Sequence, residues 1–569
     1  MTDRTADPLA SRPWLAAYAE AVPDEIEVPD TSLPEMLEQS VRRHRKRIAL
    51  EFFGAETSYE DLGDQISRVA GGLRKLGVRA GDRVALVLPN APQHVVAFYA
   101  VLRLGAIVVE HNPLYTTREL RHQFEDHGAR FAIVWDKVAD TVAGFPEDVR
   151  PERIVSVDLT RALPFGTRFA LRLPVKKARD SRAALTAKPK AKHLLEWGEL
   201  VAAKRLPRRH PLPAVTDTAV LQYTSGTTGS PKGVILSHRN LHANAVQGRA
   251  WVPGLEVGRE VFYGVLPFFH AYGMTLCLTF AMSIGARLVL FPKFDLDLVL
   301  TAAKKSPPTF LPAVPPIYDQ LARAAGRRGI DLSSVRFAIS GAMNLPVLTV
   351  TRWEEATGGL LVEGYGMTES SPVALGNPIG PSRRPGTVGV PFPSTEIRVV
   401  DPDEPSKDVE LGEPGELLLR GPQVFEGYWK RPAETAETLL DGGWLRTGDI
   451  VTVAADGFVT IVDRRKELII TGGFNVSPSE VETVLLAHPD VEAAAAVGLP
   501  RPGGGEDVAA AIVLRAGATP DTAGVREFAR KHLAAYKVPK HIVVRDELPR
   551  SLIGKVLRRQ VREQLIAER

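Results

Sequence analysis

The sequence contains very little cysteine: a chain of 569 residues has one, Cys277. A single thiol cannot form a disulfide within the chain or a metal cluster built from cysteines, so neither can hold this fold together. Cys277 lies in the apolar run Met274–Met282. We expect it to be a small buried hydrophobe rather than a catalytic thiol.

The sequence also lacks an excess of one charge and any long apolar run. It has 71 Lys and Arg residues against 67 Asp and Glu residues, a balance that argues against a nucleic-acid binder. No uninterrupted apolar stretch is long enough to span a bilayer. Met1–Asp30 is acidic and lacks a basic start followed by an apolar core, so we expect no signal peptide and a cytoplasmic protein.

The first two-thirds of the chain alternates between two patterns. Helical patterns such as Gln93–Leu104 stand between apolar runs typical of short buried strands. These runs are Arg83–Leu88, Phe131–Trp135, Ala219–Tyr223, Ala286–Phe291 and Phe337–Ser340. Such alternation predicts layered α/β structure with parallel sheets.

The texture of the chain changes from Glu396 onward. Strand patterns separated by turns predict a small β-rich subdomain. They are Glu396–Asp401, Glu416–Arg420 and Phe458–Val462. We therefore predict an α/β fold with a large N-terminal domain over residues 1–465, made of layered α/β sheets and this subdomain.

The pattern of helices and strands in residues 466–569 predicts a separate, smaller α+β domain. Ser477 can cap a helix, with Pro478 in its first turn and Glu480 completing a capping box. A strand, a helix and another strand follow. They are expected at Ala509–Leu514, Thr522–Ala534 and His541–Arg545.

The strongest functional signal is a loop that directly follows a buried strand, Tyr223–Gly233, with the sequence YTSGTTGSPKG. Glycines let backbone N–H groups approach an anion, hydroxyls add donors, and Lys232 adds a positive charge. A flexible surface loop would use some of the same residues, but this density of hydroxyls beside a lysine favours polyphosphate binding. The loop is not a Walker A sequence, because Pro231 precedes the lysine and Gly233 follows it.

The loop closely resembles the signature loop of the adenylate-forming enzymes, which include acyl-CoA synthetases, peptide-synthetase adenylation domains and firefly luciferase. The resemblance implies that the loop wraps the β- and γ-phosphates of ATP, that Thr224 is a ligand of Mg²⁺, and that Lys232 is catalytic. The phosphate-binding residues it implies are Thr224, Ser225, Gly226, Thr227, Thr228, Gly229 and Lys232.

Two further motifs resemble the adenine side of the same family. In Glu363–Ser371, with the sequence EGYGMTES, the resemblance puts Tyr365 against the adenine ring, Thr368 on the α-phosphate and Glu369 on Mg²⁺. A carboxylate suits Mg²⁺ that is shared with phosphates. Ser340–Met343 resembles the wall shared by nucleotide and acyl chain. The nucleotide-binding residues implied by these motifs are Gly341, Ala342, Glu363, Gly364, Tyr365, Gly366 and Thr368.

The remaining nucleotide motifs follow in the family's order. Asp449 resembles the position that binds the ribose hydroxyls, and Arg464 resembles one that holds ribose or phosphate. Lys466 matches the hinge about which the family's C-terminal domain swings, so the resemblance implies that this domain is mobile. Lys555 resembles the catalytic lysine that binds the nucleotide, although Ile553 stands where many members have threonine.

The acid side is represented by Pro267–His270, which resembles the motif that lines the carboxylate site. A lone histidine after two phenylalanines is more often a core residue, but the resemblance implies that His270 is catalytic and faces the acyl-adenylate. Met274 stands where some long-chain members have a tryptophan gate, and a flexible methionine can line an acyl tunnel. Gly341 and Gly366 are implied to contact the substrate as well.

Val108–Leu120 is similar to a stretch of bacterial long-chain fatty acid:CoA ligases. The resemblance therefore implies ATP-dependent activation of a long-chain fatty acid to acyl-AMP and then acyl-CoA, with ATP, Mg²⁺ and coenzyme A. The alternatives are a ligase for aryl or medium-chain acids and a fatty acyl-AMP ligase that serves a carrier protein. A non-catalytic nucleotide-binding protein on the same fold is the alternative of another class.

Thr160–Lys192 stands out by charge, because it contains many Arg and Lys residues and only Asp180 as an acid. It is either a solvated surface excursion or a patch that meets anionic lipids at the inner face of the membrane. We expect small-molecule partners and no nucleic acid, while peripheral membrane association and a homodimer remain open.

Overall fold

The computed structural model describes residues 9–224, 231–471, 474–501, 506–519, 521–551 and 554–568. The chain forms two compact units. Unit 1 comprises Met1–Trp14, Ile397–Leu418 and Arg446–Arg569, and unit 2 comprises Leu15–Glu396 and Leu419–Leu445. The domain boundary predicted at 465/466 lies within unit 1 and stays a prediction.

In unit 2, the described residues form one sheet with the strand order β19-β9-β8-β4-β3-β5-β6-β7. Strands β8, β4, β3, β5, β6 and β7 run parallel, whereas β9 is antiparallel to β8 and β19 to β9. Their bounds are β3 Arg83–Val87, β4 Ile107–Glu110, β5 Phe131–Trp135, β6 Arg153–Val157, β7 Leu195–Glu196, β8 Thr218–Thr224, β9 Lys232–Ser237 and β19 Gly427–Tyr428.

A second sheet of unit 2 has the order β16-β15-β14-β13-β12-β10-β11-β1-β2 among the described residues. Neighbouring strands in the series β14-β13-β12-β10-β11-β1 are parallel. Their bounds are β1 Ile48–Phe52, β2 Ala55–Ser58, β10 Val261–Gly264, β11 Arg287–Leu290, β12 Phe310–Ala313, β13 Phe337–Ser340, β14 Leu360–Gly366, β15 Val373–Gly376 and β16 Val390–Pro391.

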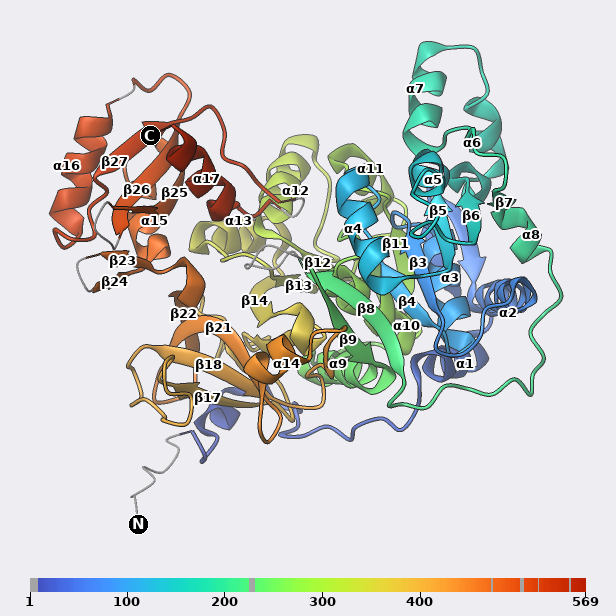
Figure 1. Cartoon of the computed structure of the whole chain (residues 1–569), viewed down its shortest axis with the longest axis horizontal. Helices are drawn as coiled ribbons and strands as arrows, with labels where there is room; N and C mark the ends of the chain where they lie inside the picture. Colours follow the sequence, from blue (N-terminus) through green and yellow to red (C-terminus); the bar gives the residue numbers. More distant parts are fainter. Residues whose placement is uncertain are drawn as a thin grey trace. The chain divides into compact units, whose positions relative to one another are not determined.

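Helices cover both sheets of unit 2 (Figure 1). Helices α4 and α5 pack on one face of the first sheet through an apolar cluster that includes Leu120, Phe124 and Val142. Helix α3 contacts both β1 and β4, and every residue from Gln93 to Arg103 is buried. The longer helices are α1 Leu33–His44, α2 Tyr59–Leu76, α3 Pro92–Arg103, α4 Thr117–His127, α5 Asp136–Ala143, α7 Lys176–Leu185, α9 His238–Trp251, α11 Leu296–Ala303, α12 Pro315–Arg328 and α13 Val347–Thr357.

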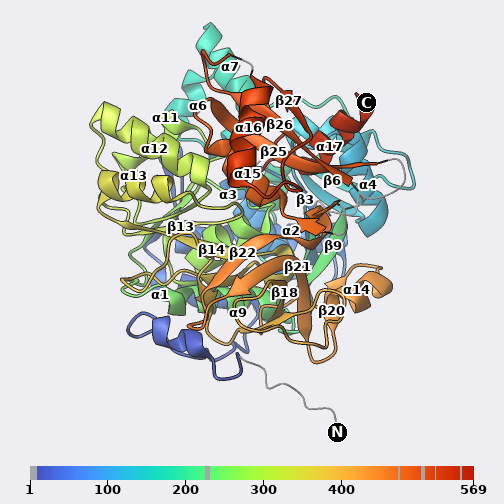
Figure 2. The ribbon, with the colours of Figure 1, turned by 90° about the vertical axis from the view of Figure 1, so that its left-hand side faces the viewer.

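The C-terminal part of unit 1 is a three-layer structure around β25 (Val491–Pro500), β26 (Glu506–Leu514) and β27 (His541–Val544). Side chains alternate along each strand, so Ala510 and Ile512 face one layer while Ala509 and Ala511 face the other. Helices α15 (Pro478–Leu486) and α16 (Thr522–His532) cover the first face, and α17 (Arg558–Ala567) covers the second (Figures 1 and 2).

The β-rich part of unit 1 contains most of β17 (Glu396–Val400), β18 (Gly415–Arg420) and β21 (Trp444–Val453), with β22 (Val459–Arg464) beside β21. The predicted fold class is confirmed: layered α/β sheets, a β-rich subdomain and a smaller C-terminal α+β part. The mobility of that C-terminal part stays a prediction.

One local prediction is wrong. Ser477 does cap α15, because its Oγ accepts a hydrogen bond from the Glu480 N–H at 3.1 Å. Glu480 does not complete a capping box, since its carboxylate instead bonds the Lys537 ammonium at 2.7 Å. A long-range ion pair has taken the place of the local contact that the sequence suggested.

Cys277 is fully buried, as expected, and its Sγ lies 3.9 Å from the carbonyl oxygen of Tyr263. Burial raises the pKa of this thiol to about 12. In the part of the chain that the structure describes, each helix is too short or too polar to cross a lipid bilayer.

Candidate active site

The predicted site motifs of unit 2 lie where parallel strands end. Thr224 ends β8, His270 follows β10, Gly341 follows β13 and Gly366 ends β14. Ligands of open α/β sheets bind outside the carboxyl ends of the strands. The topology therefore gathers segments that are far apart in the sequence at the edges where such a ligand would bind.

The phosphate-loop motif is a β8–β9 hairpin, in which Thr224 pairs with Lys232. The predicted residues Ser225, Gly226, Thr227, Thr228 and Gly229 lie outside the described residues. The Lys232 ammonium lies 4.8 Å from the centroid of the Tyr428 ring, on the neighbouring strand β19. A cation over an aromatic face is attracted by the ring quadrupole, so Tyr428 holds Lys232 beside the loop.

Tyr428 also links Lys232 to the predicted magnesium ligand. Its hydroxyl donates a hydrogen bond to Oε1 of Glu369 at 2.7 Å, and the Glu369 carbonyl oxygen accepts from the Phe425 N–H at 2.9 Å. Glu369 belongs to a short 3₁₀ segment, Thr368–Ser370, that lies beside β9. The sequence analysis missed Tyr428, which stands almost sixty residues from Glu369.

These residues fit a magnesium ion only if phosphates supply part of its coordination. The described residues contain no cluster of three or more His, Cys, Asp or Glu side chains able to hold a metal. Mg²⁺ in nucleotide sites typically uses one or two protein oxygens together with waters and phosphate oxygens. Glu369 and Thr224 match that donor set.

Close packing explains the glycines on the adenine side. A Cβ at Gly366 would lie 1.8 Å from the Pro372 carbonyl oxygen, and one at Gly341 would lie 3.1 Å from the Tyr272 ring. Ala342 has a φ of 64°, which is uncommon for a residue with a side chain. Tyr365 is buried on β14, and Gly364 pairs with Gly376 of β15.

Glu363 is almost fully buried at the start of this motif, with 6% of its surface exposed. Burial raises the pKa of its carboxyl to about 8, although a backbone hydrogen bond from Leu345 opposes the shift. Glu363 therefore keeps its proton at neutral pH and brings no charge to the site.

The acid-side segment is held by two amide side chains that the sequence analysis missed. The Asn90 Nδ2 donates to the carbonyl oxygens of Gly264 and Leu266 at 3.0 and 2.7 Å. Its Oδ1 accepts from the Phe268 N–H at 2.9 Å. Gln222, two residues before Thr224, donates to the Phe269 carbonyl oxygen. These bonds fix the backbone of the Pro267–His270 motif.

The same segment also reaches the second sheet. The Tyr272 hydroxyl donates to the Ile339 carbonyl oxygen at 2.6 Å, and the Thr275 hydroxyl donates to the Ser371 carbonyl oxygen at 2.6 Å. Together with the bond from Gln222, these contacts make residues 267–275 a bridge between the phosphate strand β8 and the adenine-side motifs. The predicted phosphate, acid and adenine motifs of unit 2 are thus brought together.

His270 is partly exposed, and burial of its ring lowers its pKa to about 4. The ring is therefore neutral at physiological pH and can both donate and accept a hydrogen bond. Met274 is fully buried in the π-helical segment Gly273–Thr279, and its N–H donates to the His270 carbonyl oxygen at 2.8 Å.

Val108–Leu120, the stretch that resembles long-chain ligases, begins in β4, which pairs with the phosphate strand β8. His111 Nε2 and His127 Nε2 are 3.0 Å apart, and both rings pack on Tyr223. His127 Nδ1 accepts from the Ala129 N–H, so its proton is on Nε2, and His111 Nδ1 donates to the Val109 carbonyl oxygen. Burial lowers the pKa of both histidines. This contact supports β8 rather than an acyl pocket.

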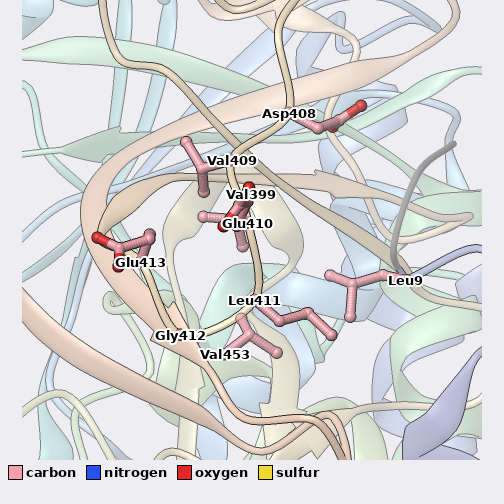
Figure 3. Close-up of a pocket in the computed structure, with 9 residues that line it drawn as sticks. All are labelled: Leu9, Val399, Asp408, Val409, Glu410, Leu411, Gly412, Glu413 and Val453. Atoms are coloured by element: carbon pink, nitrogen blue, oxygen red, sulfur yellow. The ribbon is translucent and has the colours of Figure 1, made fainter. Parts of the chain in front are cut away.

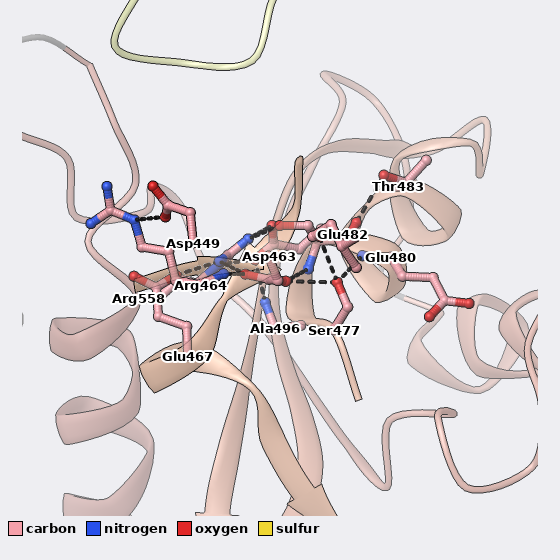
Figure 4. A network of polar contacts seen from close by, with 12 residues as sticks. Asp449, Asp463, Arg464, Glu467, Ser477, Glu480, Glu482, Thr483, Ala496 and Arg558 are labelled. Atoms are coloured by element: carbon pink, nitrogen blue, oxygen red, sulfur yellow. Dashed lines mark hydrogen bonds and ion pairs between the residues drawn. The ribbon is translucent and has the colours of Figure 1, made fainter. Parts of the chain in front are cut away.

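The ribose-side residues lie in unit 1. Arg464 and Asp449 are paired across β21 and β22, with Arg464 Nε 3.2 Å from Asp449 Oδ1 (Figure 4). The Lys555 N–H donates a hydrogen bond to Ser551 Oγ at 3.1 Å. Burial and the charge of Arg464 lower the pKa of Lys555, while Glu467 and Asp449 oppose the shift. The structure thus brings three predicted nucleotide residues of this unit together.

Arg558, three residues after Lys555, is the centre of a partly buried ion network (Figure 4). Its guanidinium bonds both carboxylate oxygens of Glu482 at 2.7 and 2.6 Å, Glu467 at 2.5 Å and Asp463 at 3.2 Å. These carboxylates raise the pKa of Arg558. Asp463 also accepts from Ser477 Oγ at 2.7 Å. The predicted hinge residue, Lys466, lies between Asp463 and Ser477 along the chain.

Of two pockets, one is lined by residues of these motifs and the other is not. The pocket in Figure 3 lies in unit 1, where Leu9, Leu411 and Val453 meet; it contains no predicted site residue. A narrow cavity in unit 2 has Glu363 and Gly364 at one side. Its remaining lining is mainly apolar and includes Trp251, Val252, Leu276, Phe280, Val373 and Phe392.

Two family matches cover most of the chain. Residues 37–429 match the family described as AMP-binding enzyme, and residues 480–555 match the AMP-binding enzyme C-terminal domain. The chain belongs to the AMP-binding enzymes. The two matches flank the predicted boundary between residues 465 and 466.

Relatives of this AMP-binding enzyme span nearly its whole length. It is 38% identical over 567 residues to the long-chain-fatty-acid–CoA ligase of Bacillus subtilis (strain 168), which covers 98% of each chain. It is 35% identical over 515 residues to a feruloyl-CoA synthase of Amycolatopsis, covering 90% of this chain and 95% of that one. These matches support acyl-CoA ligation through an adenylate as the reaction class.

Solved structures of the family have the same fold. The anthranilate CoA ligase AuaEII in complex with anthranoyl-AMP has a TM-score of 0.81 and 27% identity, covering 96% of this chain and 99% of that one. ATP-bound MatB from Rhodopseudomonas palustris has a TM-score of 0.79 and 29% identity, covering 94% and 99%. The bound molecules of these two proteins are an acyl-adenylate and ATP.

Proposed function

We propose that this AMP-binding enzyme joins a long-chain fatty acid to coenzyme A through an acyl-adenylate made from ATP. The observation that carries the proposal is the near-complete match in length to a long-chain fatty acid ligase. Because one relative is a feruloyl-CoA synthase, an aryl acid is the competing substrate class. The small cavity beside Gly364, about 10 Å³ in volume, has a mainly apolar lining, which suits contact with a hydrocarbon chain.

In the first step, a carboxylate oxygen of the acid attacks the α-phosphorus of ATP, and pyrophosphate leaves. Negative charge grows on the phosphoryl oxygens, so fixed positive groups lower the barrier. We assign Lys232 to the leaving phosphates and Lys555 to the α-phosphate. Magnesium held by Glu369 and Thr224 would neutralise further phosphate charge when bound.

Other residues of the chain orient the reactants. Asn90 and Gln222 fix the backbone before His270, whose neutral ring can hydrogen-bond the acid. We assign Asp449 to the ribose hydroxyls, with Arg464 beside it. In the second step, the thiol of coenzyme A loses its proton and attacks the acyl carbonyl carbon, and AMP leaves with the electrons of the anhydride bond.

Separate measurement of the two steps tests this proposal. Pyrophosphate release and thioester formation are measured with acetate, ferulate, laurate and palmitate. Palmitate should give the highest kcat/KM, and a higher value for acetate or ferulate would overturn the long-chain assignment. Adenylate without thioester would favour a carrier-protein ligase, and no pyrophosphate with any acid would favour a non-catalytic protein.

Lys555→Ala tests the lysine assignment in the same assay. The variant should lose about 10²- to 10³-fold in adenylate formation, the effect of removing one preorganised electrostatic group. It should still make thioester from supplied acyl-adenylate. Lys531→Ala, at an exposed lysine of the same unit, is the matched control and should leave both steps unchanged.

A further inference from the structure

The segment from Thr160 to Lys192 forms a structured projection on unit 2. It contains two helices, α6 (Phe165–Ala170) and α7 (Lys176–Leu185), which stand away from the sheet that contains β5 and β6 (Figures 1 and 2). No residue of α6 is buried, and Ala178 is the buried residue of α7. Most of both helices therefore faces solvent.

The base of this projection is fixed to the fold. The Trp135 indole N–H donates to the Leu185 carbonyl oxygen at 2.9 Å, and the Lys137 ammonium donates to the Ala183 carbonyl oxygen at 2.8 Å. Asp140 accepts from the Lys190 N–H at 2.8 Å. Several bonds to β5 and α5 thus hold the end of α7 and the residues after it in place, as expected for a surface that is built rather than a loose excursion.

Exposed apolar side chains are concentrated in α6 and in the residues between α6 and α7. Phe165 is 77% exposed, Phe169 62%, Leu173 45% and Val175 52%. They are four of the fifteen large hydrophobic side chains that are exposed among the described residues, yet they lie within eleven positions. Phe165 and Phe169 are four residues apart on one helix and share a face.

Positive charge surrounds these apolar side chains. Residues 160–192 contain ten Lys and Arg residues and one acid, Asp180. Without this segment, the 71 basic and 67 acidic residues of the chain become 61 and 66, so the rest of the protein has a net negative charge. The Arg168 guanidinium lies 5.9 Å from the Phe165 ring centroid, which brings cation and apolar surface together.

We propose that α6, α7 and the residues between them dock this protein on an anionic membrane surface. Lysine and arginine would meet lipid phosphates, while Phe165, Phe169, Leu173 and Val175 enter the boundary between headgroups and acyl chains. Nucleic acid fits less well, because aliphatic side chains do not stack on bases as aromatic rings do. Two exposed aliphatic residues beside two phenylalanines match a lipid surface instead.

Co-sedimentation with vesicles tests the proposal on the full chain without substrates, so the result does not depend on the proposed reaction. One set of vesicles contains equal parts of phosphatidylglycerol and phosphatidylcholine, and another contains phosphatidylcholine alone. The protein should bind the anionic vesicles at low salt and release them at high salt, because screening shortens the range of charge attraction to about 3 Å at 1 M.

Two double variants separate charge from apolar insertion. Lys176→Glu with Lys177→Glu should weaken binding at least about twentyfold, at about fivefold for each basic residue lost. Phe165→Ala with Phe169→Ala should weaken the binding at low salt about tenfold, because apolar side chains no longer enter the membrane. All four side chains are exposed, so thermal unfolding should not change.

Matched controls come from elsewhere on unit 2. Lys304→Glu with Lys305→Glu changes another exposed lysine pair, and Val347→Ala with Leu348→Ala truncates another exposed apolar pair. Both should bind vesicles as the unaltered protein does. Equal losses in the controls, absence of binding at low salt, or equal binding to neutral vesicles would overturn the proposal. If only the Lys176→Glu and Lys177→Glu variant lost vesicle binding, and the unaltered protein bound duplex RNA, the surface would be assigned to nucleic acid instead.

Discussion

Asp463→Asn should separate the two half-reactions if the C-terminal part swings about Lys466. Asp463 stands before this hinge, and three of its partners, Ser477, Ser479 and Arg558, stand after it. Rotation at Lys466 would break these bonds. If the proposed hinge and lysine roles hold, the network would act as a latch that stabilises the arrangement in which Lys555 lies near Asp449 and Arg464, which we propose is the one that makes the adenylate.

The geometry sets the size of the effect. Asp463 Oδ1 accepts from the Arg464 N–H at 2.8 Å and from Arg558 at 3.2 Å, while Oδ2 accepts from Ser477 Oγ at 2.7 Å and the Ser479 N–H at 2.8 Å. Either orientation of an asparagine amide turns its NH₂ group toward two donors. Each unsatisfied buried group costs about 1–3 kcal/mol, so the two together should weaken the latch by about 2–6 kcal/mol.

The assay measures the two steps separately in Asp463→Asn. Adenylate formation should fall about 30-fold or more, because about 1.4 kcal/mol corresponds to a factor of ten. Thioester formation from supplied acyl-adenylate should be unchanged or faster. Arg558→Lys keeps the charge but loses the planar fork, so it should act in the same direction more weakly. Equal loss in both steps with folding intact, or loss of the thioester step alone, would refute the latch.

Asp408→Asn is the matched control for the latch. Asp408 belongs to the same unit and bonds Arg398 at 2.8 Å, away from the hinge segment. This variant should leave the ratio of the two half-reactions unchanged.

Two further predictions concern unit 2. Burial raises the pKa of the Glu363 carboxyl from 4.5 to about 8, so the unfolded chain releases this proton at a lower pH than the folded chain does. The protonated carboxyl therefore contributes its full stability below about pH 4.5, and this contribution falls as the pH rises to about 8. Glu363→Gln should thus gain stability relative to the unaltered protein as the pH rises from about 4.5 to about 8, by at most about 5 kcal/mol in denaturant unfolding; a difference independent of pH would contradict this. Gly248→Ala should reduce the small apolar cavity, since a Cβ there lies 3.7 Å from the Phe280 ring, and should lower kcat/KM for palmitate about tenfold relative to laurate. Gly326→Ala, at an exposed helix position with open space, should leave that ratio unchanged.

The strands and helices were largely predictable because their signal is local. Phe131–Trp135 and Phe337–Ser340 have the predicted bounds, and the predicted helix Gln93–Leu104 runs from Pro92 to Arg103. Apolar runs of four or five residues between polar turns suit a strand buried on both faces. The order of strands in each sheet was not predictable, since it depends on how distant segments pack.

The site was predictable only where a motif is contiguous. Asn90, Gln222 and Tyr428 act through partners between 47 and 178 positions away, and single polar residues give no periodic signal. Tyr428 stands 59 positions from Glu369, and nothing in the sequence around it marks it. A position just after a parallel strand, as for Asn90 after β3, is the signal that could have found it.

The burial of the one cysteine limits which groups of the protein can react with the acyl-adenylate, the product of the first step. An acyl-adenylate acylates a nearby thiolate, and acyl-CoA ligation passes through such an adenylate. Its one thiol, Cys277, is enclosed by protein and has a pKa near 12, so almost none of it is ionised at neutral pH. The enzyme should therefore resist self-acylation, and a cysteine introduced on its surface would be a unique attachment point for probes of motion.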